Sequence, residues 1–183
     1  HERKSIHTSP TGFLPVKVDG RHTYFEWISA GHYVSGSERG TMTLVTEGIV
    51  REVYFGFDAN RLMIRIDTAR HAAEDLEKAD ELRIVFNEPQ GFDIRVTGLK
   101  QHAPKARLYH DEKPLPRAHL EAAVDQILEL TVAFADLDLK PDDRIQMHVD
   151  LLARKQSVDR APREGALELV VPSPDFELVM WQA

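Results

Sequence analysis

Apolar and polar residues alternate along most of this chain, and this pattern constrains its fold more than any other feature. A period of two puts every second side chain on the same face of an extended strand. The stretch VREVYFGF at 50–57 places Val53, Phe55 and Phe57 on one face, and RLMIRID at 61–67 repeats the arrangement. These two stretches are therefore predicted to pair as an antiparallel hairpin.

The same alternation recurs further along the chain, so that at least eight strands are expected. The additional segments lie at 81–86, 92–96, 127–134, 145–152 and 167–171. Short strands that each bury one face are typical of two antiparallel sheets packed face to face. The chain is therefore predicted to be an all-β, two-sheet antiparallel β-sandwich, with a closed barrel as the architectural alternative.

Helical periodicity is confined to connections. TARHAAEDLEKAD, which starts at Thr68, is predicted to contain a helix with Asp67 or Thr68 as its cap. A second short helix is predicted over 117–124. Two stretches without an apolar pattern are predicted to be loops, namely 101–116 and 155–165.

The length of 183 residues suits one domain, predicted over 13–183 after a polar lead-in or linker at 1–12. Because the chain starts at His1 instead of Met, it is expected to be a processed chain or a segment of a longer protein. Between the strands of the predicted hairpin, Asp58 and Asn60 are expected to shape a tight turn, since short polar side chains bond their own backbone.

Charge and composition narrow the classes of partner. A net charge of −7 argues against nucleic acid, whose phosphates are bound by clustered Lys and Arg. No apolar run approaches the ~20 residues of a membrane helix, so a membrane partner is not expected. The absence of cysteine excludes disulfides and thiolate metal sites. The cytoplasm is the expected location, with secretion as the alternative.

Three stretches carry a family resemblance: YFEWISAGHYV followed by GTMTLV, then YFGFDANRLMIRID, and finally ILELTVAFADLDLKPDDRIQMHVDLL. They resemble the C-terminal β-sandwich that follows the catalytic barrel in bacterial α-amylase-like proteins of glycoside hydrolase family 57. The wider likeness is to DOMON-like sandwiches, including family 9 carbohydrate-binding modules. It covers residues 24–152, with matches at Phe55, Gly56, Asp58, Leu62, Arg65, Asp67, Glu129, Phe134, Leu137 and Asp143.

The resemblance implies a non-catalytic accessory domain of an α-glucan-active hydrolase. Its partners would be the parent enzyme's catalytic domain and α-glucan or another polysaccharide. The isolated chain is not expected to be an enzyme, because the hydrolase's catalytic residues belong to the barrel. Met63 stands where the DOMON pattern often has Tyr. The alternative is a purely structural or interaction sandwich that packs on the barrel and has no ligand.

Carbohydrate binding requires aromatic faces beside planar polar side chains. Exposure of Trp27 or Trp181 on a concave surface would favour binding, whereas burial of both would favour the structural interpretation. No pair of carboxylates stands out for glycoside hydrolysis. The residues predicted to contact carbohydrate are Trp27, Tyr33, Tyr54, Arg61, Arg65 and Trp181.

No cofactor is expected, because the nine histidines include no HExxH motif and no pair at strand spacing. Structural calcium is the one metal that the sequence suggests, through oxygen ligands in an acidic turn. The clustered carboxylates are those of Asp136, Asp138, Asp142 and Asp143.

Overall fold

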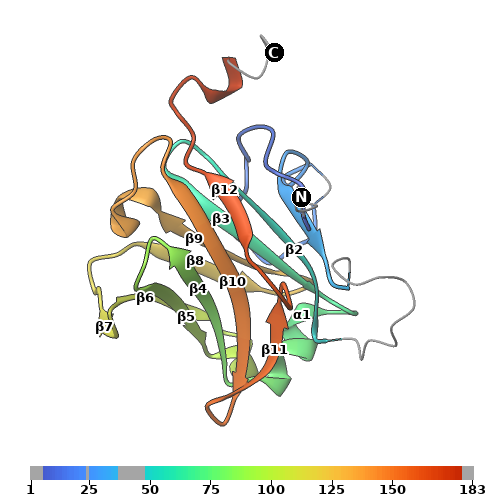
Figure 1. Cartoon of the computed structure of the whole chain (residues 1–183). Coiled ribbons are helices and arrows are strands. Elements are labelled where there is room, and N and C mark those ends of the chain that lie inside the picture. The colour runs from blue at the N-terminus through green and yellow to red at the C-terminus, as the bar shows by residue number, and fades with distance from the viewer. Residues whose placement is uncertain (1–5, 24, 37–47, 179–183) are drawn as a thin grey trace.

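The computed structural model describes residues 6–23, 25–36 and 48–178. Within these residues the chain folds into two antiparallel sheets that face each other (Figure 1). No helix in the described part of the chain is long and apolar enough to cross a membrane. The predicted all-β sandwich is confirmed.

The smaller sheet has five strands in the order β1-β2-β3-β9-β8. The larger has seven, in the order β11-β10-β4-β5-β6-β7, with β12 also pairing with β10. Among the described residues, no strand of one sheet pairs with a strand of the other, so this is a sandwich and not the closed barrel. The bounds are β1 Gly31–Val34, β2 Val50–Phe57, β3 Arg61–Thr68, β4 Glu81–Glu88, β5 Phe92–Thr97, β6 Lys105–His110, β7 Lys113–Pro114, β8 Leu120–Val124, β9 Leu128–Ala133, β10 Arg144–Ala153, β11 Gln156–Ala161 and β12 Leu167–Val170.

The core forms where the alternating apolar residues of the two sheets meet. Val53, Phe55 and Phe57 of β2 are all buried, as the alternation predicts. Ile84 of β4 and Ile94 of β5 are fully buried on the facing sheet and belong to the same cluster. Burial of such side chains stabilises the fold by roughly 1.5–3 kcal/mol each relative to exposure.

The hairpin connection is a structural turn, as predicted. The Asp58 carboxylate accepts hydrogen bonds from the backbone N–H groups of Asn60 (2.9 Å) and Arg61 (2.8 Å). The same carboxylate binds the Arg61 guanidinium at 2.9 Å. Asp58 therefore provides the hydrogen-bond acceptors that the turn needs, and both of its carboxylate oxygens are already bound.

The predicted second helix at 117–124 is wrong, because Leu120–Val124 forms the edge strand β8. The strand pairs with β9 from Leu120 opposite Val132 to Val124 opposite Leu128. The alanine-rich sequence favours a helix locally, but pairing along β9 overrides that weak preference.

The two predicted loops are also wrong in part. The first, at 101–116, contains β6 and β7, and the second, at 155–165, contains β11. These strands lie toward the edges of the larger sheet, where charged side chains are common because they discourage pairing with other chains. Val158 in β11 is 49% exposed, so the strand lacks a clean buried face.

The predicted first helix exists but is shorter than its sequence pattern. It consists of α1, Ala72–Asp75, followed by the 3-10 turn η1, Leu76–Lys78. The proposed cap is wrong, because His71 is the N-cap and makes no side-chain capping bond. The carboxylate of Asp75 instead stabilises the start of the helix by accepting hydrogen bonds from the backbone N–H groups of Arg70 and His71.

The N-terminal segment covers the outer face of the smaller sheet. Leu14, Val16 and Trp27 are buried there against Met63 of β3, and we call these four residues the Trp27 cluster. Further toward the N-terminus, Thr8 forms an isolated bridge with His32. The N-terminal segment thus covers the outer face around Met63, which explains why Met63 is fully buried.

Candidate functional site

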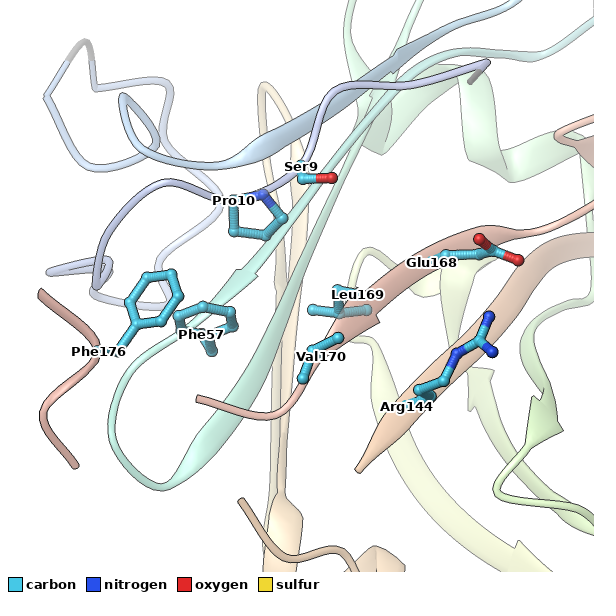
Figure 2. A pocket seen from close by; sticks show the side chains of 8 residues that line it. All are labelled: Ser9, Pro10, Phe57, Arg144, Glu168, Leu169, Val170 and Phe176. Atoms are coloured by element: carbon cyan, nitrogen blue, oxygen red, sulfur yellow. The ribbon is translucent and has the colours of Figure 1, made fainter. Parts of the chain in front are cut away.

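A pocket of about 310 Å³ opens at one end of the sandwich, and we call it the end pocket (Figure 2). It lies between the N-terminal segment, the end of β2, the start of β10, strand β12 and the turn at 173–178 that follows β12. Its lining consists of Ser9, Pro10, Phe57, Arg144, Glu168, Leu169, Val170 and Phe176.

Two phenylalanines form the apolar end of this pocket. Figure 2 shows Phe57 and Phe176 side by side, and their rings meet edge to face with centroids 5.1 Å apart. Phe57 reaches this position because it is the last inward residue of β2. Phe176 is held by its turn, in which its N–H donates to the carbonyl of Ser173 and Glu177 accepts the N–H of Phe13.

Strand β12 contributes backbone groups to the pocket. Val171 donates its backbone N–H to Asp143 and accepts the N–H of Asp142, two residues that precede β10. Because backbone groups alternate in direction along a strand, those of Leu169 also point toward β10. The N–H of Glu168 points the other way and donates to Nε2 of His7 at 3.1 Å. Val170 has the same orientation, and its N–H and C=O meet no hydrogen-bonding partner among the described residues.

Polar side chains mark the rim. Figure 2 shows Arg144 and Glu168 close together, with Ser9 across the pocket. Glu168 accepts a hydrogen bond from Gln146 Nε2 at 2.8 Å, whereas the exposed Arg144 has no ion-pair partner in the described part of the chain. The site therefore combines an apolar wall with a guanidinium, a carboxylate, a hydroxyl and free backbone groups, which suits binding of a small polyhydroxyl molecule.

The structure places Trp27 in a closed environment. It is only 4% exposed, and its indole Nε1 donates to Glu129 Oε2 at 2.9 Å. The other oxygen, Glu129 Oε1, accepts the N–H groups of Asp19 and Gly20. Burial raises the pKa of the Glu129 carboxyl, and these three donors oppose part of that rise. Trp27 thus offers no face to a ligand.

Tyr33 and Arg61 are also engaged. The Tyr33 ring is fully buried in the core between the sheets. Arg61 pairs with Asp58 at 2.9 Å and lies 3.5 Å from the carboxylate of Glu121. Arg61 lies at the turn end of the hairpin of β2 and β3, whereas Tyr33 is opposite Val53 in the middle of β2.

Tyr54 and Arg65 lie next to each other on the outer face of the smaller sheet. The Arg65 guanidinium sits 4.3 Å from the centre of the Tyr54 ring, and His32 stacks on that ring at 4.2 Å. Arg65 is 4% exposed and forms two 2.7 Å bonds to Asp67. Burial, followed by the charge of Glu52, raises the pKa of Tyr54. With a partner on each side, the Tyr54 ring has no open face for a sugar.

Trp181 lies outside the described residues, so its predicted role stays a prediction. The structure brings Tyr54 and Arg65 together and packs Tyr54 against the Trp27 cluster. Tyr33 lies in the core between the sheets, and neither it nor Arg61, Trp27, Tyr54 or Arg65 lines the end pocket. The residues that line it were missed because alternation marks Phe57 and Phe176 as core. A usable signal was the run Pro172 to Pro174 after β12, which turns the chain away and leaves a strand edge open.

A second, more polar pocket of about 280 Å³ lies beside α1. Its lining comprises His22, Asp67, Thr68, Arg70, His71, Gln126 and Ile127. Asp67 is already paired with Arg65, and Nε2 of His71 lies 3.3 Å from Asp125. No cluster of three or more His, Asp or Glu side chains suited to a metal ion occurs in the described ranges. Two carboxylates of the acidic turn, those of Asp136 and Asp143, accept backbone N–H groups.

These features define a two-sheet β-sandwich with a pocket of small-molecule size at one end. No family model and no curated protein matches the chain. One solved structure that resembles it is a protein of Bacteroides uniformis named as a "putative carbohydrate-binding protein", with a TM-score of 0.33 and 7% identity over 67% of this chain and 69% of that chain.

Proposed function

We propose that this chain is a non-catalytic accessory β-sandwich of a family 57 α-amylase-like hydrolase, and that its end pocket binds a short segment of α-glucan. The observation that carries the proposal is the composition of the pocket, in which the half-buried Phe176 ring, backed by the buried Phe57, stands opposite hydrogen-bonding groups. The sequence resemblance to the hydrolase's C-terminal sandwich supplies the parent enzyme and the glucan.

Each part of a glucose unit has a matching group in this pocket. The C–H face of a sugar ring packs on aromatic and aliphatic side chains, here the half-buried Phe176 and the exposed Val170. Its hydroxyls both donate and accept, which suits the free N–H and C=O of Val170. The guanidinium of Arg144 adds a fork of donors.

The same lining favours binding without hydrolysis. Glycoside hydrolysis uses two carboxyl groups about 5–10 Å apart across the scissile bond. Glu168 is the single carboxylate of the described pocket lining, and it is already bound by Gln146. A bound glucan would therefore be held and not cleaved.

A second candidate is a structural domain that packs on the catalytic barrel and has no ligand. It is favoured by the burial of Trp27 and Tyr33, and by two exposed apolar side chains on the turn that follows residue 24. Phe25 is 75% exposed and Ile28 is 65% exposed. Such a pair fits a contact with another domain better than a contact with a sugar.

Affinity electrophoresis in gels that contain amylose, glycogen or pullulan distinguishes the two candidates. We expect wild-type protein to be retarded and Phe176→Ala to migrate as in a glucan-free gel. Leu178→Ala is the matched control, because Leu178 is on the same turn and 65% exposed but does not line the pocket. Circular dichroism of each variant checks that it is folded.

Two results would contradict glucan binding. Unretarded wild-type protein in every gel would favour the structural candidate. Equal retardation of wild type and Phe176→Ala would place the contact outside the end pocket.

A further inference from the structure

A groove of about 770 Å³ runs along the seam where one edge of each sheet meets the N-terminal segment. We call it the edge groove. Its walls are residues 16–18 of the N-terminal segment, residues 104–106 at the start of β6 and residues 120–122 of β8. It shares no lining residue with the end pocket.

Strand β8 presents a free backbone edge to this groove. In the part of the chain that the structure describes, it is the last strand of the smaller sheet and pairs with β9 alone. Phe134 donates its backbone N–H to Asn60, next to β3, so the backbone groups of every second residue before it, such as Val132, also point toward β3. Those of the residues between them, such as Thr131, point toward β8, where Thr131 pairs with Glu121. The N–H and C=O groups of Leu120 and Ala122 consequently point away from β9, toward the groove.

Strand β6 presents a second free edge on the opposite wall. Leu108 accepts the N–H of Leu115, so its backbone points away from β5. Ala106 is two residues earlier and points the same way, but β7 pairs only with Tyr109 and His110. Within the described chain, the N–H and C=O of Ala106 therefore have no strand partner.

Positive charge is in excess around the groove. Lys17 and Lys105 line it and are exposed, and neither ammonium forms an ion pair with a described residue. The carboxylate of Glu121 is the acidic group of the lining, and it lies 3.5 Å from Arg61. Two unpaired cations beside free backbone edges stand out in a chain with a net charge of −7.

We propose that the edge groove binds an extended, acidic peptide segment of a partner protein by strand addition to β8. The free N–H and C=O groups of Leu120 and Ala122 would pair with the peptide backbone, as an added strand does at an open sheet edge. Lys17 and Lys105 would contact its acidic side chains. The proposal is independent of glucan binding at the end pocket.

Other occupants fit less well. A second copy of this chain that paired β8 against β8 would bring the same lysines and the same acidic surface toward each other. An anionic polysaccharide would satisfy the lysines but has no regular backbone N–H and C=O groups to match those of β8.

The test uses a fluorescein-labelled peptide of about seven residues, in which glutamates alternate with valines, and fluorescence anisotropy. A second peptide has lysines in place of the glutamates. We expect the acidic peptide to bind, and the lysine peptide to bind about tenfold more weakly or worse. Lys17→Glu combined with Lys105→Glu is expected to weaken binding of the acidic peptide by a similar factor.

Ala122→Pro separates strand addition from simple charge attraction. The Ala122 N–H points away from β9, so a proline removes an edge donor but no bond of the ladder. We expect the variant to keep the wild-type circular dichroism spectrum and to lose peptide binding. Lys78→Glu, an exposed charge reversal beside α1, is the control and should bind normally.

Several outcomes would overturn the proposal. These are absence of binding by the acidic peptide, equal binding of both peptides, and wild-type affinity in Ala122→Pro with a wild-type spectrum. Concentration-dependent dimerisation that Ala122→Pro abolishes would assign β8 to a second copy instead. Loss of glucan retardation in the gels above leaves these measurements unaffected, so the two proposals fail separately.

Discussion

Two aromatic regions of this sandwich differ in how their polar atoms are satisfied. In the Trp27 cluster, the indole N–H is bound by Glu129, whose other oxygen is bound by two backbone N–H groups. In the end pocket, the half-buried Phe176, backed by the buried Phe57, lies beside Val170, whose backbone groups no described residue binds. The first region is closed to ligands and the second is open.

This difference teaches that residue type does not identify a binding site in such a fold. Tryptophan is the stronger sugar-binding residue by type, yet Trp27 serves to hold the N-terminal segment on the smaller sheet. Phenylalanine is the more ordinary core residue, yet Phe176 forms a wall that meets solvent. What separates them is the number of hydrogen-bonding groups nearby that remain available.

Truncation of the two aromatics is expected to give the largest contrast. Trp27→Ala removes a buried ring from the Trp27 cluster and leaves Glu129 without one donor, so we expect a loss of about 3–5 kcal/mol in the free energy of unfolding. Phe176→Ala removes a half-buried ring and should cost less than about 2 kcal/mol. Urea denaturation followed by circular dichroism measures both.

Trp27→Phe sharpens the comparison, because it keeps most of the apolar ring but removes the indole N–H. We expect it to lie between wild type and Trp27→Ala. If Trp27→Ala cost no more than Phe176→Ala, the Trp27 cluster would not be the closed region described above.

A smaller effect is expected in the pH dependence of stability. Burial raises the native-state pKa of Glu129 above the value of about 4.3 of an unfolded glutamate. The native state then binds the proton more tightly, so the stability that this group contributes is complete below pH ~4.3 and falls as pH rises through the native pKa. The loss is roughly 1.4 kcal/mol for each unit of pKa difference.

Glu129→Gln removes this titration. As pH increases from about 4 to 7, the unfolding free energy of wild type should therefore fall relative to that of Glu129→Gln. Denaturation series at several pH values measure this difference, in which titration of the other groups cancels. A difference that moved the opposite way would show that the three N–H donors outweigh burial and lower the pKa.

Much of the fold could be predicted from sequence because its central strands each bury one face. The hairpin of β2 and β3 followed from alternation, and its Asp58 turn followed from the preference of short polar residues for their own backbone. Strands β8 and β11 could not be found in this way. They lie at edges, where neither face is fully buried and pairing with a neighbour outweighs local preference.

The site was harder to predict than the fold. Alternation indicates that Phe57 points inward but not what stands across from it, and the residues of the end pocket come from five separate parts of the chain. The stacking of Tyr54 between His32 and Arg65 depends on cross-strand register, which no single stretch of sequence contains. The prediction that Tyr54 contacts carbohydrate did not include His32 and Arg65, which cover its ring.

The position of bound glucan tests the contrast between the two regions most directly. Amide and indole resonances of ¹⁵N-labelled protein can be followed while a linear α-1,4-linked glucan oligosaccharide is added. We expect the backbone amides of Ser9, Val170 and Phe176 to shift, with the Trp27 indole unchanged. Shifts centred on the Trp27 indole, or no shift at any of these positions at saturating oligosaccharide, would contradict the assignment of the end pocket as the open, ligand-binding region.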